Sequence, residues 1–176
     1  MLRIASQYTF CSPQQILRRM VVEQDEHNVV KRLFSLDDSS VESSQTLFFD
    51  GIISTDIVSL KQNLPSKAIA QLLENYNYID LSTIMPTLPI IPLEKPLLLD
   101  FNSNNPKIIN QLLPRLASIF AHFSIFEIIA ACAYFPTLLM ERPAKLTETY
   151  IGNLLLWEGA DLPNKKITEK TQIHQF

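Results

Sequence analysis

Glycine is scarce in this chain: only three occur among 176 residues, against eleven prolines. A loop that wraps phosphate groups needs closely spaced glycines, so the sequence excludes a glycine-rich nucleotide-binding loop. Two cysteines, Cys11 and Cys132, are too few for a disulfide framework. Cys132 lies in an apolar run and is expected to be a buried, inert thiol. Cys11 precedes Ser12-Pro13 and is expected to be a turn residue rather than a nucleophile.

Charged residues are also few, at 19%, and the formal net charge is −3. Lysine and arginine are scattered and never form more than a pair, which argues against a nucleic-acid partner. The first ten residues alternate in polarity and lack the continuous apolar segment of a signal peptide. The sequence therefore predicts a cytoplasmic, reduced protein, and it offers no motif for a cofactor.

Alternating polarity predicts strands at both ends of the chain. Four alternating runs come first, and their short connections predict an antiparallel meander. Gly51 interrupts the fourth run, which marks a bulge or a close approach of another backbone. The serine- and aspartate-rich segment 37–45 before it is expected to be an exposed loop. Two further strands close the chain, so the predicted strands span residues 2–10, 16–24, 29–36, 47–53, 150–158 and 171–176.

The central part of the chain, residues 64–141, changes to a helical period. Pro65 can open one helix and Pro106 another. Apolar residues from Ile108 to Phe123 repeat at helical spacing, and Pro114 is expected to kink or split that helix. A short strand is predicted at 97–100. Prolines spaced three or four residues apart over 86–96 predict an extended surface crossing.

The stretch 116–140 is apolar enough to raise the alternative of a membrane span. A capping box from Ser124 to Glu127 divides it, and Pro136 is expected to end the second helix early. Glu127 and His122 would be costly near the middle of a bilayer. The sequence therefore favours two packed helices and no membrane, and a membrane-associated protein remains the alternative.

These patterns together predict an α+β fold in a single domain, 1–176. The β segments 1–60 and 150–176 should pair into an antiparallel sheet or a small β-sandwich. The helical insert 64–141 must then cover the apolar face of that sheet.

The stretch 48–63, FFDGIISTDIVSLKQN, resembles a junction of the amidohydrolase superfamily of metal-dependent hydrolases. In that family an aromatic-x-Gly-aliphatic strand leads into Pro-Gly-Phe-Ile/Val-Asp/Asn-x-His-x-His, and the two histidines bind the metal. Here Lys61 and Asn63 stand where the histidines would be. A lysine ammonium and a neutral amide are poor ligands for zinc, so the resemblance implies a lost metal site.

Two further segments carry the resemblance. The LLLD sequence ending at Asp100 is similar to the last barrel strand, whose terminal aspartate is a metal ligand and proton shuttle. The C-terminal third, 126–176, is similar to the family's late helix and final β segments, with Gly152 and Gly159 in the strand region. A complete barrel takes ~250 residues, and too few lie between Asn63 and Pro106 to build one. The resemblance thus implies a barrel-deleted relative that keeps the β portions.

The first functional hypothesis is a non-catalytic remnant that acts as an interaction or small-ligand-binding module. Its helices would need new cover, so a homodimer is predicted, and the partner is an unknown protein or small molecule. The alternative is a small enzyme of unknown chemistry that uses Asp100 with Lys61 as a cationic partner. A structural role is the competing interpretation, in which Asp100 and nearby asparagines cap the helix that begins at Pro106. The candidate binding residues are Lys61, Asn63, Asp100, Asn102 and Asn104, and no metal ligand is predicted.

Overall fold

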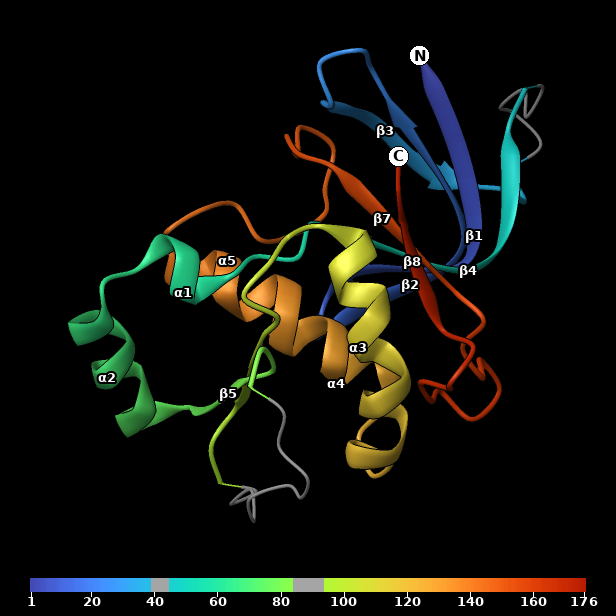
Figure 1. Ribbon diagram of the computed structural model, residues 1–176. Coiled ribbons are helices and arrows are strands. Elements are labelled where there is room, and N and C mark those ends of the chain that lie inside the picture. The colour runs from blue at the N-terminus through green and yellow to red at the C-terminus, as the bar shows by residue number, and fades with distance from the viewer. Residues whose placement is uncertain (39–44, 84–93) are drawn as a thin grey trace.

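A six-stranded sheet organises the protein in this computed structural model, which describes residues 1–38, 45–83 and 94–176 (Figure 1). The strand order is β3-β2-β1-β4-β7-β8, so strands from both ends of the chain share one sheet. The α+β class predicted from the sequence is confirmed. The strands of this sheet are β1 (Leu2–Ser12), β2 (Gln15–Gln24), β3 (Val30–Ser35), β4 (Leu47–Thr55), β7 (Leu154–Glu158) and β8 (Gln172–Gln175).

The antiparallel meander holds for the first three strands and is wrong for the fourth. β1 pairs with β2, and β2 with β3, in antiparallel register. β4 does not follow β3 at the edge but lies between β1 and β7, parallel to β1 and antiparallel to β7. The sheet is therefore mixed. The physical reason is burial: the consecutive residues Ile52 and Ile53 are both 0% exposed, and only a central strand covered on both faces hides neighbours that point in opposite directions.

Gly51 lies both at a β-bulge and at a close approach of another backbone, the two features expected of a glycine inside a strand. Ser6 pairs with Phe49 but Tyr8 pairs with Ile52, so β4 carries one extra residue at this point, which is a β-bulge. In addition, a Cβ atom at Gly51 would collide with the backbone carbonyl oxygen of Trp157 on β7. The missing side chain lets β4 and β7 pair at this position.

The central region holds helices and also a second, two-stranded parallel sheet that the sequence did not fully reveal. The strand β6 (Leu97–Asp100) was predicted, but its partner β5 (Asn77–Asp80) was not. β5 is only four residues long and half polar, so its period carries little signal. The helices are α1 (Leu60–Asn63), α2 (Ser66–Asn75), α3 (Pro106–Ile119), α4 (Ile125–Ile129) and α5 (Phe135–Leu139), with a π-helical turn η1 (Ala130–Tyr134) between the last two.

Two apolar clusters flank the central strands. The larger one packs Ile52, Trp157 and Ile173 of the sheet against α3 and the α4–η1 segment. The smaller one contains the neighbouring residues Ile53 and Leu156 of the same strands. Figure 1 shows α3 and α4 against one end of the sheet, whereas α2 stands apart from it. Consistent with that position, α2 has an apolar stripe but no buried residue.

The expectation that Pro136 ends its helix is wrong. The helix from Ile125 continues through η1 and α5 to Leu139. Pro136 has no N–H for the carbonyl of Cys132, and that carbonyl instead accepts a hydrogen bond from the Val58 N–H at 3.2 Å. The π-helical turn and this contact absorb the proline, and they tie the helix to the β4–α1 connection.

Pro114 does not split α3, which continues from Pro106 to Ile119. Pro114 lies on the exposed side of the helix. Among the described residues, no helix combines the length and apolar character needed to cross a membrane. Pro86, Pro89 and Pro92 of the predicted proline-rich crossing lie outside the described residues. Residues 39–44 of the predicted loop also lie outside them.

Candidate functional site

Asp100, at the end of β6, is the centre of a closed hydrogen-bond network. Its side chain is fully buried. One carboxylate oxygen, Oδ1, accepts from the Ser59 hydroxyl at 2.8 Å and from the Asn102 backbone N–H at 2.8 Å. The other, Oδ2, accepts from the Lys61 backbone N–H at 2.7 Å and from the Tyr78 hydroxyl at 2.9 Å. Four donors satisfy a buried charge, which is the arrangement that stabilises it.

A second carboxylate, Asp80, lies beside this network because β5 and β6 are parallel and pair Asp80 with Asp100. The Lys61 ammonium donates to Asp80 at 2.7 Å, and this hydrogen bond raises the pKa of Lys61. Burial raises the pKa of Asp80, but hydrogen bonds from Lys61 and Ser82 outweigh it and the net shift is downward. Burial and the Asp100 carboxylate raise the pKa of Tyr78, so its hydroxyl stays protonated as a donor.

The structure brings together only part of the residue set predicted from the sequence. Lys61, Asp100 and Asn102 belong to the network described above. Asn63 instead donates from its side-chain amide to the Ser59 carbonyl at 2.7 Å, within the turn of α1. Asn104 is exposed. The predicted cap of α3 is made by none of these residues but by Asn105, whose side chain accepts from the Lys107 N–H.

This network indicates a structural role for Asp100. Both oxygens are occupied by internal donors, so neither is free to take a proton from a substrate. Asp100 joins the β4–α1 connection, β5 and the β6–α3 loop at one point. Within the described ranges, no group of three or more histidine, cysteine, aspartate or glutamate side chains is placed to hold a metal ion.

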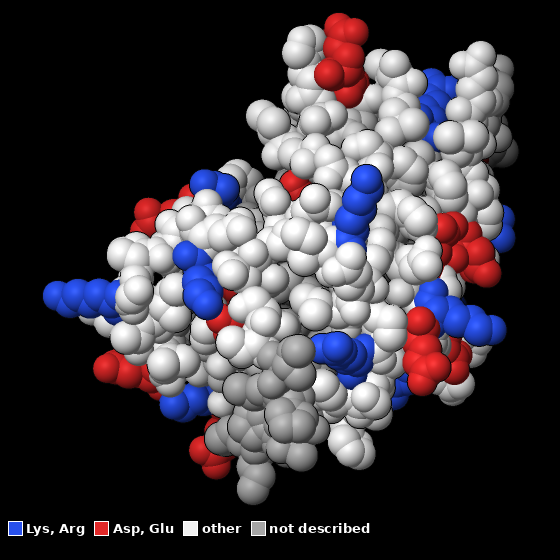
Figure 2. Space-filling view, in the orientation of Figure 1, with Lys and Arg blue, Asp and Glu red and all other residues white. Residues whose placement is uncertain are grey.

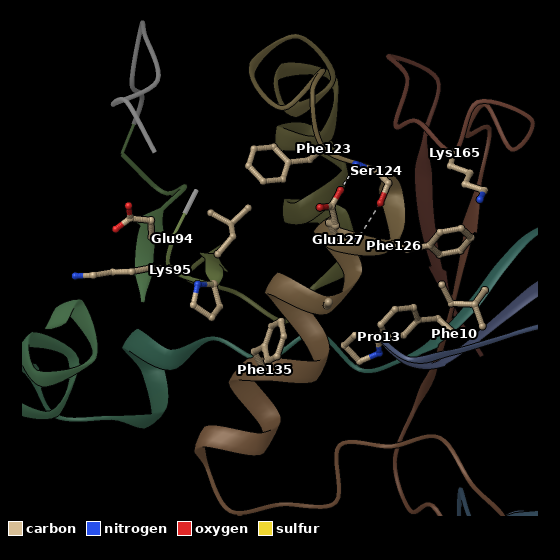
Figure 3. Close-up of a pocket in the computed structure, with 14 residues that line it drawn as sticks. Phe10, Pro13, Glu94, Lys95, Phe123, Ser124, Phe126, Glu127, Phe135 and Lys165 are labelled. Carbon is tan, nitrogen blue, oxygen red and sulfur yellow. Dashed lines mark hydrogen bonds between the residues drawn. The ribbon is translucent and has the colours of Figure 1, made fainter. Parts of the chain in front are cut away.

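A hollow that can take a ligand lies elsewhere, on the helix side of the sheet. It is a cleft of about 720 Å³, within the range of small-molecule sites. Its wall is formed by the end of the β1–β2 hairpin, the segment before β6, the start of α4, α5 and the β7–β8 connection. Figure 3 shows its phenyl rings, which come from Phe10, Phe123, Phe126 and Phe135.

Packing holds these rings in place. Phe10 is 1% exposed and belongs to the larger core cluster, and the Tyr8 ring meets the edge of Phe126 with 5.5 Å between centroids. Phe123 makes a similar edge contact with Phe120 at 5.7 Å. The apolar wall is thus the outer layer of the core and needs no rearrangement to exist.

The polar groups of the wall are few. Ser124 and Glu127 form the capping box of α4: the Glu127 carboxylate accepts from the Ser124 N–H at 2.7 Å, and the Ser124 hydroxyl accepts from the Glu127 N–H at 3.2 Å. Glu94 and Lys95 lie on the opposite side, and Lys165 lies near Phe126. This arrangement can bind an apolar body: apart from Glu127, which is engaged in the capping box, its charged groups lie at the two sides of the cleft.

Sequence reasoning missed this cleft. It identified the capping box and the strand that ends at Phe10, but as separate local features. Phe10, Phe126 and Lys165 lie far apart in the sequence, and no periodic pattern reports that they meet. The available signal was weak: aromatic residues at the ends of elements rather than in their middle.

Comparison of the chain with protein-family models, curated proteins and solved structures finds no match. The amidohydrolase resemblance therefore stays a prediction, and the functional argument depends on the geometry of this chain alone.

Proposed function

We propose that this protein is a non-catalytic module that binds a small, largely apolar molecule in the cleft between the β1–β2 hairpin and α4. The observation that carries the proposal is the cleft itself: about 720 Å³, with four phenylalanines in its wall. Burying apolar surface of a ligand against such a wall contributes roughly 25 cal/mol per Å². The rings are fixed by core contacts, so little ordering cost opposes binding.

The polar chemistry of the described residues supports a binding role rather than a catalytic one. Asp100 is closed off by four internal donors. In the cleft, Ser124 and Glu127 are occupied by each other. Nucleophilic catalysis needs a nucleophile within reach of an adjacent base that is free to accept its proton, and neither site offers that pair.

A neutral fluorescent probe, N-phenyl-1-naphthylamine, tests the proposal directly. We expect saturable binding to the wild-type protein, seen as a rise in probe fluorescence. The Ala130→Phe variant adds a ring to a residue of the wall and should abolish most of this signal. The Phe135→Ala variant removes one ring of the wall and should weaken binding several-fold.

Phe34→Ala is the matched control for Phe135→Ala. Both phenylalanines are half-buried, but Phe34 lies on β3, outside the cleft, under the guanidinium of Arg32. Each variant is first shown to unfold cooperatively, because probes of this kind also bind loosened proteins. Equal probe binding by wild type and Ala130→Phe, or no saturable binding by wild type, would contradict the proposal.

A second candidate function, self-association, is favoured by the exposed side of α2. This helix buries none of its residues, and Leu73 is 50% exposed. On the face shown in Figure 2, acidic and basic side chains are interspersed and separated by wide uncharged areas. We propose a homodimer that covers α2. Light scattering after size exclusion should give twice the chain mass, and Leu73→Gln should shift it toward the monomer; a monomer at every concentration contradicts the idea.

The remaining parts of the proposal come from the sequence. We propose that the chain is a barrel-deleted relative of the amidohydrolases and that it acts in the cytoplasm. Recovery of the protein in a membrane or extracellular fraction would contradict the location. Stoichiometric, tightly bound zinc in the purified protein would contradict the loss of the metal site that this ancestry implies.

A further inference from the structure

The cleft has one margin that carries unpaired positive charge. Lys165 lies in the turn between β7 and β8, and its backbone is held on both sides. Its carbonyl accepts from the Ile125 N–H at 2.8 Å, and its own N–H donates to the Leu162 carbonyl at 3.1 Å. Its φ of 55° fixes the tight turn further. The side chain therefore starts from a rigid point at the mouth of the cleft.

No hydrogen bond or ion pair joins the Lys165 ammonium to another described residue. Of the acidic side chains of the wall, Glu127 accepts through one carboxylate oxygen from the Ser124 N–H. Asp161, in the same turn, accepts from the backbone and the side chain of Asn164. Next along the chain, the Lys166 ammonium donates to the Phe123 carbonyl at 3.1 Å, which brings a second positive charge to this side.

The charged side chains on the two sides of the cleft point in different directions. Figure 3 shows Lys165 on the same side of the cleft as Phe126 and Phe10. Glu94 and Lys95 lie across the cleft, and their charged ends point away from the rings. Lys95 donates weakly to the Leu73 carbonyl at 3.5 Å. Beside the aromatic part of the cleft, Lys165 is therefore the positive charge of the wall, and its ammonium has no partner among the described residues.

From this geometry we infer that the ligand is a monocarboxylate with an aromatic or aliphatic body. The body lies against the phenylalanines, and the carboxylate accepts from the Lys165 ammonium at the mouth. A charge-assisted contact beside apolar rings is stronger than one in open solvent, because the local dielectric is lower. This inference rests on the proposed function, since it names the ligand class of the same cleft.

A pair of probes that differ only in charge tests the inference. 2-Naphthoate and its methyl ester carry the same ring system, and calorimetry measures the affinity of each for the intact chain. We expect 2-naphthoate to bind about fivefold to tenfold more tightly than the ester, the effect of one partly exposed charge-assisted contact. Raising the salt concentration should reduce that difference.

Lys165→Met keeps the length of the side chain and removes its charge. We expect this variant to bind 2-naphthoate and the ester equally, with the affinity for the ester unchanged. Lys170→Met is the matched control, because it removes an exposed lysine of the same β7–β8 connection that lies outside the wall, and it should leave both affinities as in wild type. A wild-type protein that binds both probes equally, or a Lys165→Met variant that keeps the preference for 2-naphthoate, overturns the inference alone. Failure of the wild type to bind either probe overturns the proposed function.

Discussion

Replacement of Asp100 by asparagine is the sharpest test of the structural role assigned to this residue. Asp100→Asn preserves the shape of the side chain and replaces one carboxylate oxygen by an NH₂ group. Each oxygen of Asp100 accepts from one backbone N–H and one hydroxyl, so in either orientation the new NH₂ faces a backbone N–H that can only donate, while the hydroxyl can turn to accept. One hydrogen bond is lost and its buried N–H is left unpaired, and the amide cannot turn to recover it.

The expected cost follows from these contacts. A hydrogen bond to a charged group contributes ~1.5–3 kcal/mol, and a buried N–H left without a partner costs a further ~1–3 kcal/mol, so the two effects together come to about 3–6 kcal/mol. A neutral amide is less costly to bury than a carboxylate, which offsets part of this loss. We therefore expect the free energy of unfolding to fall by about 3 kcal/mol, a large share of the ~5–15 kcal/mol that stabilises a typical domain.

Urea unfolding followed by the fluorescence of Trp157 measures this change. Trp157 is the single tryptophan of the chain and is fully buried. Tyr78→Phe removes one donor and leaves Oδ2 with the Lys61 N–H, so we expect about half the effect. Asn104→Ala, an exposed neighbour of the same loop, is the control and should stay within ~0.5 kcal/mol of wild type. If Asp100→Asn were as stable as wild type, the network would not hold these segments together. The structural role would then be refuted, and the hypothesis of a functional role for Asp100 would be favoured.

Three further outcomes follow from the structure. Gly51→Ala should destabilise the protein by ~1–3 kcal/mol in urea unfolding, because the new methyl group meets the Trp157 carbonyl; an unchanged midpoint would contradict the close approach of β4 and β7. Asn110→Ala should cost ~2–4 kcal/mol, because the Asn110 amide pairs with both the N–H and the carbonyl of Ile173 on edge strand β8, at 2.7 and 2.9 Å; a loss below ~0.5 kcal/mol would contradict this. Burial raises the pKa of Cys11 from 9.0 to about 11, so the unfolded chain loses this proton first and wild-type stability should fall between pH 9 and 11. The decline should be shallower in Cys11→Ala, and equal slopes in stability against pH would refute the assignment.

Features that depend on neighbouring residues were determined by the sequence itself. The presence of the N-terminal strands, the capping box at Ser124 and the special position of Gly51 were correctly predicted, whereas the burial of β1 does not alternate as its sequence does. The strands and the capping box reflect local backbone preference and a hydrogen bond across three residues, so a short window of sequence contains their cause. At Gly51 the window marks the position, but the backbone that approaches it comes from Trp157.

Prolines show the limit of such local rules. Pro114 and Pro136 both carry the same chemical restriction, yet both helices continue past them. In the second case the freed carbonyl of Cys132 finds the Val58 N–H, which comes from another part of the chain. A local rule gives the cost of a proline but not the distant partner that offsets it.

The tertiary structure alone decided the position of β4, the network around Asp100 and the cleft. All three depend on groups that are distant in sequence: β4 with β7, Asp100 with Ser59, and Phe126 with Phe10. Period and composition state which face of a strand or helix is apolar, but they do not state which other face covers it. That choice is made when the chain folds, because the free energy gained by burying apolar surface depends on contacts between distant segments and not on any one segment.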